Sequence, residues 1–345
     1  MPLRKIAFVL DDFVAGSPGQ QLMDRFLIGY AREGEFRRNS DREIAVWLAA
    51  AADPGGLAAR QREFKLSRPN LAATMIEADA VVVVAAAGRV SPSEDLLRKV
   101  FEQAPIGSAC FVYGALATDL AAAQRLAALA AARQLVLASG TSIATAFRLP
   151  DVAVPANLPL AETLIVLQGP RPLAELWGID GLSSVAPLHG GESAIRSVRR
   201  LDGHGVWRAS DAGQWSWPLL AAAISRSNTM QGDPVRDGRT QDLVGLGLVR
   251  KLAREPRGWL IEHRDGLRST VLVLDGVVAD INFAVRCSDG ATVSAQLYRP
   301  PAPNRGEFDP LVAVLEDFFT TRQVPWPLER SLLVAHFLQS VTRTK

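Results

Sequence analysis

The sequence predicts an α/β protein with an N-terminal Rossmann-type parallel sheet and a C-terminal α+β domain that carries an open antiparallel sheet. Between residues 5 and 138, short apolar runs alternate with helix-like stretches, which is typical of a parallel sheet with helices on both faces. Three prolines follow within residues 149–159, and a β-rich block with Asp-Gly pairs lies beyond them. Because 345 residues exceed the usual size of one hydrophobic core, we expect two domains, at 1–148 and 149–345.

The N-terminal strands are predicted from their apolar content. The runs that suit buried strands are 5–10, 43–48, 80–85, 109–113 and 134–138. Helices are expected at 20–33, 57–64 and 71–77, then from a cap at Ser91 to residue 103, and from a cap at Asp119 to residue 133. We count this alternation as a complete Rossmann-type unit of six strands and five crossovers.

The second domain has a different pattern. A strand is expected at 164–167, helices at 173–188 and 217–224, and two closing helices at 310–321 and 328–340. Four runs at 259–263, 269–274, 277–286 and 292–298 are separated by Asp-Gly pairs and predict an antiparallel meander. Alternation along two of these runs puts Asn282, Ser294 and Gln296 on one polar face, which we expect to join copies of the chain into a homo-oligomer.

Composition and charge limit the partners and the location. The net charge of +2 comes from interspersed acids and bases, and the arginine-rich stretches indicate solvated faces, so no nucleic-acid partner is expected. The longest apolar run, 80–87, is too short to span a membrane, and no signal peptide is recognised. Cys110 and Cys287 have no metal-ligand spacing, and no metal site is predicted. We therefore expect a cytoplasmic protein.

The loop after the first strand lies where open α/β sheets bind ligands, but it departs from the dinucleotide pattern G-x-G-x-x-G. Gly16 and Gly19 are three residues apart, Pro18 lacks an N–H, and Asp11 and Asp12 put negative charge where a phosphate would bind. Backbone donors at Gly16, Ser17 and Gly19 could still hold an anion at the helix start. The alternative is a capped turn in which Ser17 simply begins the helix.

Several short sequence segments together resemble those of the glucose–fructose oxidoreductase, inositol dehydrogenase and MocA family. They are Phe147-Arg148-Leu149-Pro150, Gly190-Gly191-Glu192 through Arg196-Ser197-Val198, Phe308-Asp309-Pro310-Leu311, and Val324-Pro325-Trp326-Pro327-Leu328-Glu329-Arg330. The resemblance implies NAD- or NADP-linked chemistry on a sugar or polyol in a homo-oligomer. Members typically carry a Lys in an E-K-P motif after the fifth strand and often a D-x-x-x-H on the first C-domain helix. Here Gly114 takes the place of the Lys, and Ser184 stands where the His would be.

Candidate site residues follow from these positions. Tyr113, at the end of a strand, and His189, which titrates near neutrality, are candidate proton carriers, and Asp180 is the aspartate retained from the family's helix motif. Arg89 is a candidate clamp for a cofactor phosphate or carboxylate. Polar or aromatic contacts to substrate are expected from the following residues: Thr141, Ser142, Arg148 and Trp177. For each, a structural role in a core, cap or surface loop is the alternative.

Two functions stay open from the sequence. In the first, the protein is a divergent oxidoreductase that binds NAD or NADP in the loop 11–19 and acts on a sugar- or polyol-like substrate in an interdomain cleft. In the second, it has no cofactor and serves as a ligand-binding, regulatory or assembly subunit, or catalyses a non-redox step. Both include a small polar ligand and a homo-oligomer.

Overall fold

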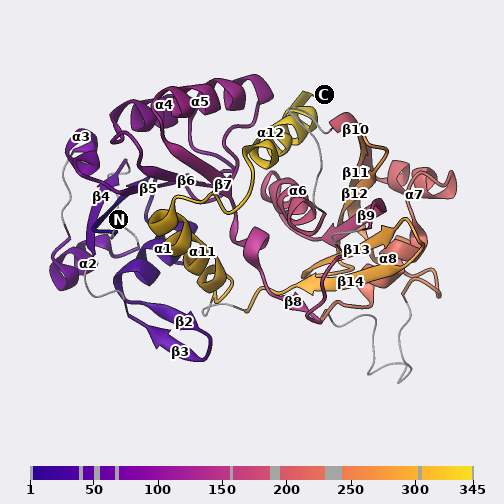
Figure 1. Cartoon of the computed structure of the whole chain (residues 1–345). Coiled ribbons are helices and arrows are strands. Elements are labelled where there is room, and N and C mark those ends of the chain that lie inside the picture. The colour runs from indigo at the N-terminus through magenta and orange to yellow at the C-terminus, as the bar shows by residue number, and fades with distance from the viewer. Residues whose placement is uncertain are drawn as a thin grey trace. The chain divides into compact units, whose positions relative to one another are not determined.

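The computed structural model in Figure 1 describes residues 3–38, 42–49, 55–66, 70–155, 158–186, 195–229, 243–301 and 305–343. The chain divides into two compact units, one made of residues 1–146 with 300–339, the other of 147–299 with 340–345. The division near residue 147 lies close to the expected boundary. The closing segment differs from expectation, because residues 300–339 pack with the first unit although the sequence placed them in the second domain.

The first unit is built on one parallel sheet with the strand order β4-β1-β5-β6-β7. The strands are β1 (Lys5–Leu10), β4 (Glu43–Leu48), β5 (Ala80–Val84), β6 (Ala109–Tyr113) and β7 (Val136–Gly140). The expected count of six strands is wrong for the described residues: this sheet has five, one for each apolar run named above. Between β4 and β5, where a doubly wound fold places its third strand, the chain forms α2 (Leu57–Phe64) and α3 (Leu71–Met75), because charged residues interrupt its apolar positions.

The helices of this unit cover both faces of the sheet. On one face lie α4 (Glu94–Gln103) and α5 (Leu120–Ala132), on the other α1 (Pro18–Leu27) and α11 (Phe308–Thr321), as Figure 1 shows. The last helix, α12 (Leu328–Arg343), contributes Leu332 and Ala335 to the core beside α4 and α5. Leu311, Leu315 and Phe319 of α11 are buried against β1 and α1, which explains why this C-terminal segment belongs to the first unit.

Two local expectations in this unit are corrected. The first helix ends at Leu27 and not at residue 33, because Gly29, with φ +119°, approaches the carbonyl of Arg37 so closely that any side chain would clash. The chain then forms the hairpin β2 (Tyr30–Arg32) and β3 (Glu35–Arg37). The cap of α4 is Ser93 and not Ser91, since the Ser93 hydroxyl accepts the N–H of Leu96.

The second unit holds a seven-stranded mixed sheet in the order β10-β11-β12-β9-β13-β14-β8. The strands are β8 (Arg148–Leu149), β9 (Leu160–Leu167), β10 (Ile195–Asp202), β11 (Arg254–His263), β12 (Arg268–Asp275), β13 (Ile281–Cys287) and β14 (Thr292–Leu297). The predicted meander is wrong, because β9 lies between β12 and β13, parallel to one and antiparallel to the other. The Asp-Gly pairs at 265–266 and 289–290 do lie in hairpins, whereas Asp275-Gly276 begins a connection that passes β9.

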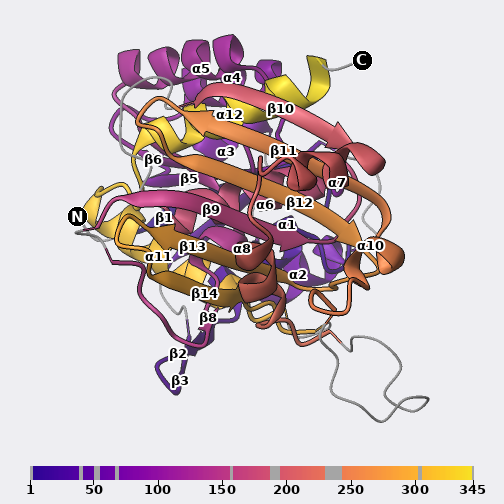
Figure 2. The same cartoon turned by 90° about the vertical axis from the view of Figure 1, so that its right-hand side faces the viewer.

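Helices also cover this sheet. On one face α6 (Leu173–Val185) packs on β9 and β12, and on the other α8 (Trp217–Ile224) lies across β9, β13 and β14, as can be followed in Figure 2. Among the described residues, this unit also has α7 (His204–Asp211), beside β10 and β11, and α10 (Val249–Leu252).

The polar face expected to join subunits is covered by the chain itself. Asn282, Ser294 and Gln296 are 0%, 7% and 3% exposed. The residues that follow α8 take up their hydrogen-bonding groups: Arg226 donates to Ser294 Oγ at 3.0 Å, and Asn228 donates to Gln296 Oε1 at 3.0 Å. The interface expected at these residues is therefore corrected, while association of copies stays a prediction without an assigned surface.

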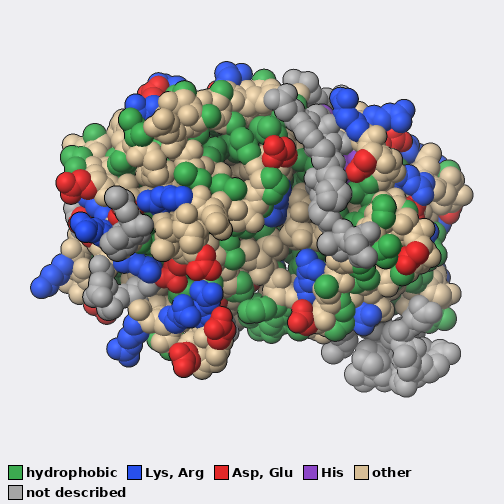
Figure 3. Space-filling view, viewed as in Figure 1, with side chains coloured by type: hydrophobic (Ala, Val, Ile, Leu, Met, Phe, Trp, Pro, Cys, Tyr) green, Lys and Arg blue, Asp and Glu red, His purple; other side chains and the backbone are tan. Residues whose placement is uncertain are grey.

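The surface charge is mixed. On the face drawn in Figure 3, basic and acidic side chains are interspersed over both units and do not gather into a patch of one sign. Among the described residues, no helix is long and apolar enough to cross a membrane.

Candidate functional site

The carboxyl edge of the parallel sheet is the first place to look for a site, because the loops after β1 and β5 meet there. Asp11 and Asp12 follow β1 directly. The Asp12 carboxylate accepts the N–H of Ala87 at 2.8 Å, and the Asp11 carboxylate accepts that of Ala86 at 3.4 Å. The two acids therefore tie the first loop to the loop after β5, and both backbone N–H groups point at carboxylates of the protein itself.

The electrostatics of this edge are dominated by Asp11. Burial raises the pKa of the Asp11 carboxyl, while the N–H of Ala86 and the charge of Arg89 act in the opposite direction. Arg89 itself lies on the exposed turn after β5. Its charge acts on the Asp11 carboxyl of the same edge, and its predicted role as a clamp for a cofactor phosphate or carboxylate stays a prediction.

Three backbone N–H groups at the start of α1, those of Gly16, Ser17 and Gln20, are bonded within the protein, whereas that of Gly19 has no hydrogen bond among the described residues. Ser17 is the N-cap and accepts the N–H of Gln20 at 3.3 Å, Pro18 has no N–H, and the Ser17 N–H donates to the carbonyl of Val14 at 2.9 Å. The amide oxygen of Gln20 accepts the N–H of Gly16. These are the backbone donors that a bound phosphate uses at a helix N-terminus. The structure therefore has the capped turn that the sequence left open as the alternative.

The two glycines of the loop have different reasons to be there. Gly16 has φ +76°, a left-handed conformation that favours glycine, and its carbonyl accepts a bond from Arg305 Nη1 at 3.3 Å. At Gly19, a Cβ would meet Leu10 Cδ2 at 3.4 Å and the carbonyl of Asp12 at 3.5 Å, which are ordinary contacts. Neither glycine is thus explained by a ligand that approaches bare backbone.

A dinucleotide pyrophosphate does not fit this edge as it stands. It would meet the carboxylates of Asp11 and Asp12, and it would have to displace Gln20 from the Gly16 N–H. Like charges in such a site cost several kcal/mol when desolvated. The cofactor that the family resemblance implies therefore meets like charge in the loop 11–19, and of the backbone N–H groups at the start of α1 only that of Gly19 has no hydrogen bond among the described residues.

Tyr113 lies at the end of β6 with residues of two other segments around it. Its ring stacks on Phe308 of α11, with the centroids 5.8 Å apart, and its hydroxyl lies 3.5 Å from Ser142 Oγ. Thr141 is fully buried and accepts the N–H of Ile143 at 3.2 Å, as the N-cap of a 3₁₀ turn at Ser142–Thr145. Tyr113 and Ser142, both predicted site residues, are thus brought together, whereas Thr141 has the capping role.

At the position where the family has its catalytic Lys, Gly114 has φ +105° and donates its N–H to the carbonyl of Gly140 at 2.9 Å. The backbone conformation at this point suits glycine, and a lysine there would be strained. The absence of the Lys is therefore built into the local geometry of the β6–β7 edge.

The other predicted residues lie in the second unit or outside the described residues. Arg148 donates to the carbonyls of Val152 and Ser184, at 3.1 and 3.3 Å, and burial lowers the pKa of its guanidinium. Asp180 is 1% exposed within α6. Trp177, also on α6, lies under the guanidinium of Arg299, whose central carbon is 4.6 Å from the ring centroid. His189 lies outside the described residues.

Sequence reasoning missed several residues that shape the carboxyl edge. Arg305 and Phe308 come to this edge from the C-terminal part of the chain. Arg25 of α1 fixes their segment by donating hydrogen bonds to Asp309 at 2.5 Å and to the Arg305 carbonyl at 2.8 Å. The sequence segment that begins at Phe308 was recognised, but only as part of the family resemblance. Gln20 gave no signal, because a glutamine in a first helical turn is common. No group of three or more His, Cys, Asp or Glu that could hold a metal ion occurs among the described residues.

The two units define a fold in which a Rossmann-type unit precedes an α+β unit. Among solved structures, the chain is similar to GenD2 from gentamicin A biosynthesis in complex with NAD, with a TM-score of 0.61 and 15% identity, over 100% of this chain and 95% of that one. It is also similar to myo-inositol dehydrogenase from Lactobacillus casei in complex with NAD(H) and myo-inositol, with a TM-score of 0.58 and 14% identity, over 99% and 94%.

A third similar structure is the UDP-N-acetylglucosamine 3-dehydrogenase GnnA from Acidithiobacillus ferrooxidans, with a TM-score of 0.57 and 14% identity, over 99% and 97% of the two chains. The predicted resemblance in fold to the glucose–fructose oxidoreductase, inositol dehydrogenase and MocA family is therefore confirmed. No protein-family model and no curated protein sequence matches the chain.

Proposed function

We propose that the protein is a ligand-binding or regulatory protein that has kept a dehydrogenase fold and does not use a nicotinamide cofactor. One observation carries this proposal: beside two carboxylates, the N–H groups of Gly16, Ser17 and Gln20 at the start of α1 are bonded to Gln20, Val14 and Ser17 in turn. Of the two functions that the sequence leaves open, the oxidoreductase needs those donors for a pyrophosphate, and the cofactor-free alternative does not.

The residue at the position of the family's catalytic Lys supports the same proposal. Gly114 carries no side chain to exchange a proton with a substrate, and Tyr113 has its ring stacked on Phe308 and its hydroxyl near Ser142. A tyrosine hydroxyl and a serine hydroxyl can together donate and accept hydrogen bonds from a polar ligand without any chemical step. The ligand class that this pair favours is a small, neutral, hydroxylated molecule such as a sugar or polyol.

The charge of the edge also favours a neutral ligand. Asp11 and Asp12 would repel an anion, and Arg89 lies close to Asp11 and offsets part of that negative charge. A polyol can accept from Arg89 and donate to either carboxylate, so that each group keeps a partner when water leaves.

A ligand screen by thermal shift tests this function. The compounds are sugars, polyols, and the oxidised and reduced forms of NAD and NADP, and the variants are Tyr113→Phe and Ser142→Ala. Tyr298→Phe is the matched control, since it removes a tyrosine hydroxyl in the other unit. We expect a sugar or polyol to raise the melting temperature of the wild type and of Tyr298→Phe, and to lose this effect in Tyr113→Phe.

The proposal is overturned by either of two outcomes. Saturable stabilisation by a nicotinamide dinucleotide would restore the oxidoreductase, with a gain of about 2.7 kcal/mol at a hundredfold excess over Kd. Stabilisation by a sugar that Tyr113→Phe and Ser142→Ala leave unchanged would place the ligand elsewhere in the chain.

A further inference from the structure

The hairpin formed by β2 and β3 projects from the first unit, as Figure 1 and Figure 2 both show. Glu33 and Gly34 join its strands with φ values of +56° and +81°, which are typical of a tight two-residue turn. The strand β2 is fixed to the unit, because Tyr30 is buried and its hydroxyl donates to Glu316 of α11 at 2.5 Å. All three residues of β3 are exposed, so β3 is the outer strand of the hairpin.

The register of the hairpin determines which backbone groups of β3 point away from β2. Arg32 pairs with Glu35 across the turn, and Ala31 pairs with Phe36. In antiparallel strands hydrogen-bonded and non-hydrogen-bonded pairs alternate, and the pair that closes a two-residue turn is hydrogen-bonded. The N–H and C=O of Phe36 are therefore directed to the outer edge, and neither has a hydrogen bond among the described residues.

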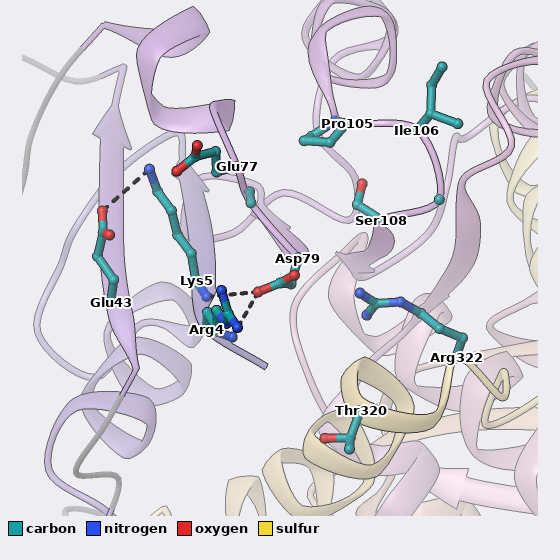
Figure 4. Close-up of a pocket in the computed structure, with 12 residues that line it drawn as sticks. Arg4, Lys5, Glu43, Glu77, Asp79, Pro105, Ile106, Ser108, Thr320 and Arg322 are labelled. Atoms are coloured by element: carbon teal, nitrogen blue, oxygen red, sulfur yellow. Dashed lines mark hydrogen bonds and ion pairs between the residues drawn. The ribbon is translucent and has the colours of Figure 1, made fainter. Parts of the chain in front are cut away.

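The charged side chains of β3 are also left without partners. Within the part of the chain that the structure describes, neither Glu35 nor Arg37 makes a side-chain hydrogen bond or an ion pair. This differs from the cavity of about 670 Å³ at the amino-terminal edge of the parallel sheet, where Lys5 Nζ lies 3.3 Å from Glu43 Oε1 (Figure 4). One acid and one base therefore remain available on β3, on the two sides of Phe36 along the strand.

The three residues of β3 are complementary to an antiparallel copy of themselves. When two such strands pair about Phe36, each Phe36 lies opposite the other, and each Glu35 lies opposite an Arg37. The outward N–H and C=O groups of the two Phe36 residues then exchange two hydrogen bonds. Charged residues on an edge strand usually prevent such pairing, but here opposite charges meet at both flanking positions, which stabilises a sheet.

An apolar surface accompanies this edge. The side chains of Phe36 and Ile28 are 58% and 49% exposed. The Phe36 ring lies beside Gly29, the residue after Ile28, where a Cβ would come within 3.0 Å of Phe36 Cε1. Pairing of two copies would place the two Phe36 rings opposite each other on one face of the sheet and remove part of this apolar surface from water.

We propose that two copies of the chain associate through β3, by antiparallel pairing of Glu35–Arg37 about a two-fold axis at Phe36. The pairing joins the two hairpins into one four-stranded sheet in the order β2-β3-β3-β2. The partner is a second copy, since the strand presents both the edge groups and the charge order that its own antiparallel copy requires. Because only three residues of each copy pair, we expect a weak dimer that depends on concentration.

This contact assigns a surface to the association that the sequence predicts, in place of the covered face at Gln296. It lies on the hairpin and uses none of the groups around Asp11 and Tyr113, so it is independent of the ligand proposed for the carboxyl edge.

Sedimentation velocity of the full chain from about 1 to 500 μM, which spans weak specific association, tests this contact. The variants are Arg37→Glu, which puts Glu opposite Glu in both flanking pairs, and Glu35→Arg, which puts Arg opposite Arg. Each should weaken the wild-type dimer about tenfold or more, because like charges directly opposite each other oppose pairing. Arg62→Glu is the matched control, since it makes the same charge change at an exposed position on α2 of the same unit, and it should dimerise like the wild type.

A mixture of the two variants gives the sharpest result. In a mixed dimer both flanking pairs are again Glu opposite Arg, so an equimolar mixture of Arg37→Glu and Glu35→Arg should dimerise at concentrations where each variant alone is monomeric. Both substituted residues are exposed, and circular dichroism with the melting temperature establishes that the variants are folded.

Three results would overturn the proposal. The first is a wild-type chain that stays monomeric up to about 500 μM. The second is a dimer that neither Arg37→Glu nor Glu35→Arg weakens, which would put the contact elsewhere on the chain. The third is a mixture of the two variants that stays monomeric, which would reject the pairing of Glu35 with Arg37.

Discussion

The C-terminal helix α11 is predicted to be a structural part of the N-terminal unit, and Leu315→Ala tests this directly. Leu315 is fully buried among Phe8, Phe26 and Phe319. The substitution removes three carbon atoms, worth about 2.4 kcal/mol at ~0.8 kcal/mol for each buried methylene. The unfilled cavity adds to this, so the expected loss is about 3 kcal/mol of the free energy of unfolding.

Hydrogen exchange localises the loss. Where exchange requires opening of the whole unit, a loss of about 3 kcal/mol in the free energy of unfolding lowers the protection of backbone N–H groups in β1 and β5 about 150-fold. The strands β11 and β12, in the second unit, should keep their protection. Leu274→Ala in β12 is the matched control, because Leu274 is also fully buried and its loss should affect the second unit. Unchanged protection of β1 and β5 in Leu315→Ala would refute the assignment of α11.

Three further predictions concern a cap, a buried amide and a buried histidine. Ser17→Ala removes the N-cap of α1 and should lower the free energy of unfolding by about 1 kcal/mol in urea titrations, whereas an unchanged midpoint would contradict the capped turn. Gln296→Glu puts a carboxylate where the Gln296 amide donates to Asp280 at 2.8 Å, and should cost about 3 kcal/mol or more with no change of mass in light scattering. A change of mass without a loss of stability would show that this face is a subunit contact after all. Burial lowers the pKa of His263 below 6.5, so the folded protein favours its neutral form. The free energy of unfolding is therefore fully present above pH 6.5 and should fall below that pH, by at most about 1.4 kcal/mol per pH unit. This fall should be smaller in His263→Gln. An identical pH dependence in wild type and His263→Gln would show that this histidine does not contribute.

The sequence predicted those parts of the fold that depend on local chemistry. The apolar runs at β1, β5 and β6 form strands, and Asp119 caps its helix through the N–H of Ala122, since both signals lie within a few residues. The capping of α4 was misassigned by two residues, because Ser91 and Ser93 both precede the helix and only the structure distinguishes them.

Contacts between distant segments could not be predicted in this way. The insertion of β9 between β12 and β13 pairs residues more than a hundred positions apart, and no local pattern specifies it. The docking of α11 on β1 and α1 is of the same kind. An Asp-Gly pair such as Asp275-Gly276 indicates a turn, but it does not fix which strand comes next in the sheet.

The sequence alone shows how the candidate site departs from the dinucleotide motif, but it does not show which contacts its residues make. The sequence alone shows the irregular glycine spacing, Pro18 and the two acids. Two bonds of this loop need the folded chain: the Gly16 N–H donates to Gln20 Oε1, and Arg305 donates to the Gly16 carbonyl.

The central claim is that the carboxyl edge of the first unit has lost its dinucleotide site. A calorimetric titration of the wild-type chain with NADH and with NADPH, each to about 1 mM, tests it most directly. We expect no saturable heat with either dinucleotide, because the N–H groups of Gly16, Ser17 and Gln20 are bonded within the protein and Asp11 and Asp12 oppose the pyrophosphate. Saturable micromolar binding of either one would contradict this claim and make the chain a nicotinamide-dependent oxidoreductase.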